Sequence, residues 1–574
     1  MSYKFKMVTR NAIINFSEEY CRSSIELINS VGFSKVTAAF VRHKKKLDDI
    51  TYRYLTQAAA REINITADLK KISRLLLIMD SDELCAAYPE LKGYFKSKRT
   101  FLNIIEEYYL FWRRYERYAV IYADKERQGL QSVQFTSAIM DFENLVLTTY
   151  RRIQEAGMRH ENRVYRQISA GVNAGLIAAR GVTALPKEYR NLDNVPVIQQ
   201  TVINPPFITY TKRNTRDGVF PEVDYNPIDE YRFDEDAWFC YPAKVGDSLA
   251  FVYFNSKYMS QGITLSNLFE MAAEDEYRNR KPDLIYVYGY EDGEKNQCFY
   301  HDKKNDMMIG LVSAADEFDY FGYMKKMMLT LHNVRKINMG QVPIHGAMMR
   351  ITLRSGRVKN IIVMGDSGAG KSETVEQLKA VGSEEIIDLK TIYDDMGFLF
   401  IEDGKVKSSG TEVGAFVRLD DLDTGYGYKE IDRSVFMNPD KKNARIVIPI
   451  TDYTEVIAHH HIDYFLYANN YEEGKESSLE FMDNMEEILS VFRAGRRMAK
   501  GTTTEMGLVE SFFANPFGPV QRKEQTDRLI VEYFDKMQKQ GIKIGQLHTC
   551  LGIKGMEHEG PRKAAGELLA EITK

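Results

Sequence analysis

The spacing of hydrophobic residues predicts only helices in the first third of the chain. Apolar residues recur there at helical spacing, as in residues 63–79 (INITADLKKISRLLLIM), while glycines are few and the first proline is Pro89. A repeat near 3.6 residues is typical of amphipathic helices, and residues 80–83 (DSDE) indicate a break followed by a new helix N-cap. We therefore expect an all-helical N-terminal domain at residues 1–180.

The pattern changes after residue 180. Prolines accumulate among Asn, Asp and Thr in residues 181–235, which indicates a connecting segment that is partly extended. Residues 236–345 contain short apolar runs that are typical of strands, at 248–254, 283–288 and 307–312.

Residues 346–574 combine both patterns. Strand-like runs with turn signals between them come first, and helical patterns dominate the last hundred residues. The expected strands include 446–450, 464–467 and 543–547, and the expected helices are 477–492, 522–539 and 561–573. The fold class expected for the whole chain is thus α/β, with a mixed-sheet lobe that follows an all-helical domain.

One stretch of the N-terminal domain interleaves aromatic rings with arginines. It spans residues 108–122 (YYLFWRRYERYAVIY) and contains Arg113, Arg114 and Arg117. Such interleaving occurs on nucleic-acid and partner surfaces, but it also describes an amphipathic helix whose rings point inward. We favour the helix, because the domain has no further basic stripe.

Composition and charge narrow the class of protein. A formal net charge of −4 gives no global attraction to nucleic acid or to an anionic membrane. Five scattered cysteines without a Cys-x-x-Cys pair argue against a disulfide framework or a zinc knuckle. No run of 18 apolar residues and no signal-peptide core are present. We expect a cytoplasmic protein with no membrane and no nucleic-acid partner; a protein partner or self-association through the N-terminal domain stays open.

A phosphate-binding motif lies between two predicted elements. It fits the pattern G-x-x-x-x-G-K-[ST] and is here called the phosphate loop: Gly365, Asp366, Ser367, Gly368, Ala369, Gly370, Lys371 and Ser372. Residues 358–364 (VKNIIVM) predict a buried strand before it, and residues 373–381 predict a helix after it. Loop N–H groups and the helix N-terminus would face a polyphosphate. Lys371 would reach the β- and γ-phosphates, and the Ser372 hydroxyl would bind a divalent metal.

Residues that suit phosphoryl transfer flank this loop. The reaction needs cations that neutralise charge and groups that align donor and acceptor. Asp394 and Asp395 follow the loop, and such a pair can hold a metal directly or through water. His345 and Lys326 precede it. Taken singly, the aspartate pair could form a turn, His345 could be a buried core histidine, and Lys326 could be a solvated surface lysine. Their order around a phosphate loop favours a metal site instead.

These residues resemble the motifs of ATP-dependent phosphoenolpyruvate carboxykinases. Residues 320–327 (YFGYMKKM) resemble the family motif Y-A-G-E-M-K-K-G, and His345 follows Lys326 at the family's spacing. Residues 414–418 (GAFVR) and 443–450 (NARIVIPI) are similar to its G-C-Y-A-K and N-T-R-V-S-Y-P-I segments. The resemblance extends over residues 240–574.

The resemblance implies a reaction and a division of the chain. The reaction would convert oxaloacetate and ATP into phosphoenolpyruvate, CO₂ and ADP. Residues 236–345 would form a reduced substrate lobe, and residues 346–574 would form the P-loop nucleotide-binding lobe. Residues 181–235 would connect these lobes to the N-terminal domain.

The resemblance also implies a role for each matched residue. Lys326, His345 and Asp395 would bind Mn²⁺, and Ser372 would support Mg²⁺. A lysine ligand must be neutral, and burial beside a dication lowers its pKa. The catalytic residues would be Lys371 at the γ-phosphoryl group, Arg445 as a clamp, Tyr320 beside the organic acid, Asp394, and Arg418 where the family has lysine.

Two features leave the acceptor of the phosphoryl group open. We find no counterpart of the family's G-R-S-P-K-D loop, whose arginine holds the carboxylic acid. Another arginine would have to serve, and Arg493, Arg496 and Arg497 are examples. The sequence 344–346 (IHG), the phosphate loop with Glu373 and the aspartate pair also resemble HPr kinase/phosphorylase, a protein kinase family. The alternatives are therefore a kinase of a protein hydroxyl or small molecule, and an ATP-binding regulatory module.

Overall fold

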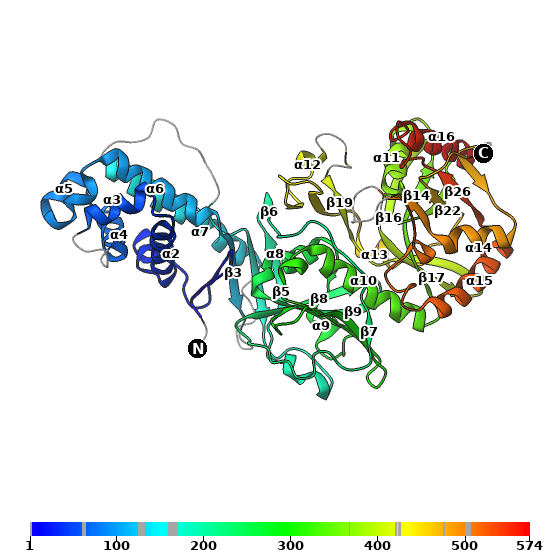
Figure 1. The fold of residues 1–574 in the computed structure, drawn as a ribbon, viewed down its shortest axis with the longest axis horizontal. Helices are drawn as coiled ribbons and strands as arrows, with labels where there is room; N and C mark the ends of the chain where they lie inside the picture. Colours follow the sequence, from blue (N-terminus) through cyan, green and yellow to red (C-terminus); the bar gives the residue numbers. More distant parts are fainter. Residues whose placement is uncertain are drawn as a thin grey trace. The chain divides into compact units, whose positions relative to one another are not determined.

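The computed structural model describes nine segments of the chain, which form two compact units. The described residues are 3–59, 65–123, 132–158, 170–366, 368–419, 422, 426–474, 477–499 and 507–574. The N-terminal unit comprises residues 1–181, 194–204 and 234–237, and the C-terminal unit comprises 182–193, 205–233 and 238–574. Both mix helices and strands (Figure 1). No described helix has the length and apolar character needed to cross a membrane.

The N-terminal unit contains a sheet whose strands hydrogen-bond in the order β1-β2-β3-β4-β5. The inner pairs β2–β3 and β3–β4 are parallel, and the outer pairs are antiparallel. The strands are β1 (Phe5–Val8), β2 (Asn11–Asn15), β3 (Glu116–Tyr122), β4 (Ala174–Ala179) and β5 (Val197–Ile203).

Seven α-helices of the described part of the N-terminal unit share one apolar core with its strands. They are α1 (Ser24–Asn29), α2 (Val31–Leu47), α3 (Ile50–Ala58), α4 (Ile65–Leu75), α5 (Ser81–Ala87), α6 (Lys98–Arg113) and α7 (Ser132–Met158). The N-cap predicted within residues 80–83 is confirmed: it is Asp80, whose carboxylate accepts hydrogen bonds from the backbone of Asp82 and Glu83 at the start of α5.

The prediction of an all-helical domain at residues 1–180 is wrong, because β1 to β4 lie within it. Every residue of β2 and of β4 is buried. A short strand that is buried on both faces reads as a continuous apolar run, which periodicity cannot distinguish from a buried helix segment. The strands were therefore assigned to the helical pattern of the segments around them.

The stretch 108–122 is also not one helix. Helix α6 ends at Arg113 and β3 begins at Glu116. Arg117 lies in the strand and is 4% exposed, and its guanidinium donates to the carbonyl oxygens of Gly171, Tyr115 (2.7 Å) and Arg113 (2.8 Å). Backbone acceptors thus hold this buried cation in place, so it belongs to no nucleic-acid surface.

The central sheet of the C-terminal unit has the order β18-β17-β14-β15-β22-β26-β23, and β16 also pairs with β14. Consecutive residues of β15 face opposite sides, as strand geometry requires. Ile361 and Val363 pack with α11 and α16, whereas Ile362 and Met364 pack with α14 and α15. The phosphate loop therefore leaves a strand that is covered by helices on both faces (Figure 1).

The elements of this sheet and its covering helices match several predictions. The expected strand 358–364 is β15, and the helix expected after the loop begins at Lys371.

The strands of the central sheet and the helices beside them are β14 (Val342–Leu353), β15 (Val358–Met364), α11 (Lys371–Val381), β16 (Ile386–Tyr393), β17 (Met396–Glu402), β18 (Lys405–Gly410), α13 (Tyr453–Val456), β22 (Tyr464–Asn469), β23 (Leu479–Phe481), α14 (Met485–Ala494), α15 (Lys523–Lys539), β26 (Lys543–His548) and α16 (Glu559–Thr573).

Part of the expected helix 477–492 is instead a strand. Residues 479–481 form β23 at the edge of the sheet, antiparallel to β26. Asn484 then begins α14, because its side chain accepts hydrogen bonds from the backbone of Glu486 and Glu487. The cap marks a boundary that apolar spacing alone did not reveal.

A second sheet of the C-terminal unit has the order β8-β9-β11-β13-β12-β7, with β10 beside β8. Helix α10 contacts β11 and β13 of this sheet and β14 and β17 of the central sheet, so it joins the two. The elements are β7 (Glu222–Val223), β8 (Trp238–Val245), β9 (Ser248–Asn255), α8 (Met259–Thr264), β10 (Glu270–Met271), α9 (Glu274–Tyr277), β11 (Leu284–Tyr290), β12 (Gln297–Asp302), β13 (Met307–Ser313) and α10 (Phe321–Asn338).

Two smaller sheets complete the unit. One has the order β19-β21-β20-β6 and carries two of the predicted arginines; the other pairs β24 with β25. The remaining elements are β6 (Phe207–Thr209), β19 (Gly414–Arg418), α12 (Tyr426–Lys429), β20 (Val435–Met437), β21 (Arg445–Pro449), β24 (Arg496–Met498) and β25 (Leu508–Glu510).

The buried guanidinium of Arg117 gives a stability prediction. Arg117→Met removes the donor for three carbonyl groups, so the free energy of unfolding should fall by about 2–4 kcal/mol. Chemical unfolding followed by circular dichroism measures the change. Arg114→Met is the matched control, because Arg114 is exposed beside it and should change stability by less than about 0.5 kcal/mol. Equal stability of the two variants would contradict the structural role of Arg117.

Candidate functional site

The phosphate loop has the predicted strand–loop–helix setting. Lys371 is the first residue of α11, is 6% exposed, and donates to the carbonyl oxygens of Gly365 (2.7 Å) and Asp366 (3.3 Å). Its ammonium group therefore lies against the loop backbone. A phosphate oxygen within the loop would offer the same donor a stronger, charged acceptor.

The loop packs tightly against two later segments of the chain, which contain Asn470 and Thr549. Gly370 has φ +102°, and a side chain there would lie 2.7 Å from Thr549. The Thr549 hydroxyl donates to the carbonyl of Ala369, and Asn470 donates to that of Gly368, each at 2.8 Å. These contacts fix the carbonyl groups of Gly368 and Ala369 in place. Ser367, which the sequence analysis assigned to the loop, lies outside the described residues.

The aspartate pair occupies the turn between β16 and β17. Ser372 donates to Asp394 at 3.2 Å, so the first helical turn after the loop touches this turn directly. Burial raises the pKa of Asp394, and the adjacent charge of Asp395 raises it further. Asp394 is thus a carboxyl group with enhanced affinity for a proton beside the phosphate loop.

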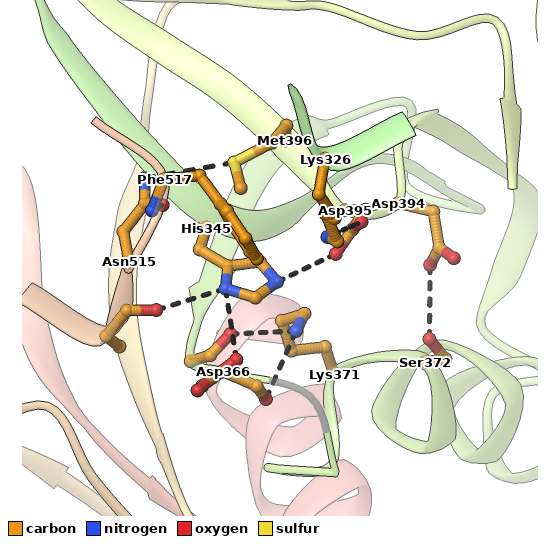
Figure 2. Close-up of polar contacts among 12 residues, drawn as sticks. Lys326, His345, Asp366, Lys371, Ser372, Asp394, Asp395, Met396, Asn515 and Phe517 are labelled. Carbon is orange, nitrogen blue, oxygen red and sulfur yellow. Dashed lines mark hydrogen bonds and ion pairs between the residues drawn. The ribbon is translucent and has the colours of Figure 1, made fainter. Parts of the chain in front are cut away.

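Asp395 is the centre of a buried cluster of ionisable groups (Figure 2). One carboxylate oxygen lies 2.6 Å from Lys325 Nζ and 2.7 Å from Lys326 Nζ, and the other lies 2.8 Å from His345 Nε2. Burial alone would raise the pKa of Asp395, but the two lysines and His345 outweigh it and hold the pKa well below its usual range. Asp395 is therefore a carboxylate.

The two lysines of α10 have different environments. Burial would lower the pKa of Lys325, but Asp395 and Glu412, the latter at 2.9 Å, raise it above its usual range. Burial lowers the pKa of Lys326 despite the attraction of Asp395. Of the two, Lys326 is the one that becomes a neutral amine more easily, as a metal ligand must.

The hydrogen bonds of His345 favour a cation next to its ring. Burial, together with the positive charge of Lys371, lowers the pKa of His345, so the ring is neutral and carries one proton. Both ring nitrogens face oxygen acceptors: Nδ1 lies 3.0 Å from the carbonyl of Ala514, and Nε2 lies 2.8 Å from a carboxylate oxygen of Asp395. A neutral ring can donate only one of these two hydrogen bonds. A cation at Nε2, with the proton on Nδ1, would satisfy both contacts, and metal-bound histidines typically donate their other N–H to a carbonyl.

The spacing of the donor atoms of Lys326, His345 and Asp395 fits a divalent metal. Neighbouring ligand atoms of an octahedral ion lie about 3 Å apart, close to the 2.7 and 2.8 Å that separate Asp395 from Lys326 and His345. The mixed nitrogen and oxygen donors suit Mn²⁺. Among the described residues, no group of three His, Cys, Asp or Glu side chains is arranged to hold a metal. The fit therefore depends on Lys326 as the third donor.

The predicted arginines face the loop from the smaller sheet. Arg418 and Arg445 are directly opposite each other on β19 and β21. Like charges at such positions repel. Arg445 also lies over the ring of Phe416, 5.3 Å from its centroid, and its buried Nε has no hydrogen-bond partner among the described residues. An anion bound beside Arg445 would give this Nε an acceptor.

A cavity of about 100 Å³ brings these predicted residues together. Its wall holds three basic and four acidic side chains, so a polyphosphate here would need a metal cation as well as the basic residues. It is lined by Gly368, Lys371, Ser372, Glu373, Glu376, Asp394, Asp395, Phe416, Val417, Arg418, Leu422 and Arg445.

The remaining predicted residues adjoin this cavity without lining it. Lys326 and His345 reach it through Asp395. Tyr320 is 4% exposed, and its ring centroid lies 6.0 Å from that of Phe416. The structure therefore joins every described residue of the predicted site into one cluster, either on the cavity wall or one contact behind it.

Sequence reasoning missed the groups that surround this cluster. Glu412 is 2% exposed, pairs with Lys325, and has its pKa raised by burial to about 7. Phe517 covers Lys326, whose Nζ lies 4.6 Å from the ring centroid. Neither has a local signal, because each reaches the site from a distant segment.

Arg216 is a cation that the sequence analysis also missed. Its guanidinium lies between the rings of Phe220 (5.2 Å) and Phe517 (5.0 Å) and donates to the carbonyl of Gly218. Burial lowers its pKa, while Tyr323, Asp366 and Tyr320 act in the opposite direction, which places it beside the predicted site. Among the described residues, no carboxylate forms an ion pair with it.

The three arginines suggested for the missing carboxylate contact have other partners. Arg493 forms a two-point ion pair with Asp527, and Arg496 pairs with Glu510. Arg497 is 3% exposed and binds Asp366 of the phosphate loop at 2.8 Å. Of the three, only Arg497 contacts the site, where it orients the loop.

Comparison with known proteins identifies no relative. No protein-family model matches the chain, and a search of curated proteins finds no significant match. The resemblance to carboxykinases therefore stays a prediction that depends on the motifs and on the contacts described above.

The environment of Lys326 gives a pH prediction. Lys326 must lose its proton to bind a metal, whereas Asp395 and His345, with lowered pKa values, are already deprotonated near neutrality. Mn²⁺ affinity should therefore rise with pH, by up to about tenfold per pH unit between about pH 6 and 9. Electron paramagnetic resonance of free Mn²⁺ measures the affinity.

Two variants test the source of this slope. Lys326→Met should bind Mn²⁺ more weakly, by at least about tenfold, and with little dependence on pH. Lys379→Met is the control, because Lys379 is exposed on the same helix as the loop lysine and should leave both quantities unchanged. An unchanged slope in Lys326→Met would exclude Lys326 as the titrating ligand.

Proposed function

We propose that this protein is an ATP- and divalent-metal-dependent phosphoryl-transfer enzyme with a carboxykinase-like nucleotide-binding lobe. The leading reaction is that of a phosphoenolpyruvate carboxykinase, with oxaloacetate and ATP as substrates. The observation that carries the proposal is that the phosphate loop contacts the residues predicted to bind the metal. Ser372 at the end of the loop donates to Asp394, and the neighbouring Asp395 contacts Lys326 and His345.

The balanced reaction assigns work to each group. Oxaloacetate loses CO₂ by cleavage of a carbon–carbon bond, the electron pair forms the enolate of pyruvate, and the enolate oxygen attacks the γ-phosphorus while ADP leaves. Lys371 would transfer its hydrogen bonds from the loop carbonyls to the γ-phosphoryl oxygens. Arg445 and Arg418 would hold the transferred group in line. A metal held by Lys326, His345 and Asp395 would neutralise charge on the enolate and the phosphoryl group.

Arg216 supports a carboxylic acid as the acceptor. A binding site for oxaloacetate needs a cation for a carboxylate, and the family's own arginine loop was not found in the sequence. Arg216 is a cation held between two aromatic rings, without a carboxylate partner among the described residues, near Asp366 and Tyr320. Held in this way, it would bind a carboxylate with little loss of side-chain freedom.

A second candidate is transfer to a hydroxyl group, as in a protein kinase. The raised pKa of Asp394 suits a general base, which removes a hydroxyl proton best when its pKa approaches the working pH. Glu373 and Glu376 also line the cavity beside it. This reading needs no carboxylate site, so it leaves Arg216 without a role. An ATP-binding module without turnover is the third alternative.

A coupled assay of oxaloacetate-dependent ADP formation distinguishes these functions. With Mn²⁺ and Mg²⁺ present, the carboxykinase proposal predicts turnover in the wild-type protein and a loss of at least about 100-fold in Lys326→Ala. Lys379→Ala should retain full activity. ATP binding without oxaloacetate turnover would overturn the carboxykinase assignment, and ³²P transfer to a hydroxyl acceptor would then favour the kinase.

The role of Arg216 is tested by its effect on the acceptor alone. Arg216→Gln should raise the KM for oxaloacetate by about 10- to 100-fold, because a charge-assisted contact with the carboxylate is lost, while ATP affinity changes little. Arg213→Gln is the control, since Arg213 lies on the same segment with about half its side chain exposed (49%). Equal KM values for the two variants would contradict carboxylate binding by Arg216.

A further inference from the structure

The N-terminal unit contains a second cavity that the phosphoryl-transfer proposal does not use. It encloses about 100 Å³ between the sheet and helices α1, α2, α4, α6 and α7. Native cores contain few voids larger than a water molecule, so a space of this size is a distinct feature of the unit. Seven of its lining side chains are aromatic: Phe5, Phe33, Tyr108, Tyr109, Trp112, Phe142 and Tyr150.

Seven of the polar side chains on the cavity wall form hydrogen bonds within the protein. Ser73 donates to the carbonyl of Leu69 at 2.8 Å, and Thr149 donates to that of Leu145 at 2.7 Å. Trp112 Nε1 donates to the carbonyl of Ala170 at 2.8 Å. In the same way, Tyr108 bonds to Thr37, Tyr150 to Glu106, Ser30 to the backbone of Phe33, and Glu19 to the backbone of Val31.

This wall selects the chemistry of a ligand. A buried water needs two to four polar partners, and an apolar cavity without them stays dry and takes up small apolar molecules. A charged ligand would lose its hydration, and the carboxylate of Glu19 on the wall already accepts a hydrogen bond from the backbone of Val31. Aromatic walls favour another ring through edge-to-face contacts.

The cavity also has a route to the surface. Its deep residues, such as Val36 (4% exposed) and Trp112 (8%), are buried. Glu19, Leu27 and Phe33 at another part of the wall are half-buried and belong to the segment around α1 and the start of α2. We infer that this cavity is a binding site for a small uncharged molecule the size of a single aromatic ring. The inference is independent of the proposed function.

Trp112 provides a direct probe of occupancy. The chain has two tryptophans, so Trp238→Phe leaves Trp112 as the only one. Iodobenzene, an uncharged ring with a heavy atom that quenches fluorescence, is titrated into the full-length Trp238→Phe protein. We expect saturable quenching with a Kd of about 0.1–1 mM, and little quenching by the iodide ion. Quenching that rises linearly without saturation would overturn the inference.

Cavity-filling variants locate the binding event. Val36→Phe and Val146→Phe, from helices α2 and α7 of the wall, should each weaken iodobenzene binding by at least about tenfold. Val31→Phe is the matched control, because Val31 begins α2, is 37% exposed and does not line the cavity. Near-ultraviolet circular dichroism checks the fold of each variant. Unchanged binding in the two folded wall variants would place iodobenzene elsewhere in the protein. If neither variant folds, the iodobenzene titration of the Trp238→Phe protein alone tests whether the cavity binds the ring.

Discussion

A buried carboxylate with three nitrogen partners connects the elements of the candidate site. Asp395 belongs to the turn before β17, its two lysine partners belong to α10, and His345 belongs to β14. A charge in this environment is tolerated only when its partners are in place, and removal of one leaves the others uncompensated. The mutual position of the helix and the central sheet is therefore coupled to the ionisation of this cluster. Because Ser372 bonds to the neighbouring Asp394, the phosphate loop is part of the same arrangement.

The site holds polar groups whose hydrogen bonding is incomplete among the described residues. The buried Nε of Arg445 has no hydrogen-bond partner there, and a neutral His345 has one proton for two oxygen acceptors. An anion beside Arg445 and a cation beside His345 would complete these contacts. Sites that bind charged ligands retain such features because the ligand completes them. The aromatic cavity of the N-terminal unit differs from this site. The polar groups named on its wall bond within the protein, so an uncharged, apolar molecule would be the ligand that completes its packing.

Much of the site was predictable because its signals are local. The phosphate loop combines a buried strand, a glycine at positive φ and a helix start within a few residues, and the structure has each of them. The order of Lys326, His345 and Asp395 around that loop also indicated that they would meet. The N-terminal strands were missed because short runs buried on both faces carry no period of their own. Arg117 was likewise read as a surface residue, although the carbonyl groups that hold it include that of the distant Gly171.

The sequence by itself determined the elements whose formation depends on neighbouring residues: the strand, loop and helix around residues 358–381, the cap at Asp80 and the final helices. Only the tertiary structure decided which distant groups complete each site. Arg216, Glu412 and Phe517 reach the cluster from separate segments, and the aromatic cavity draws its wall from five helices and two strands. The physical reason is that capping and periodicity are short-range along the chain, whereas burial, ion pairing and void formation depend on which surfaces come together in space.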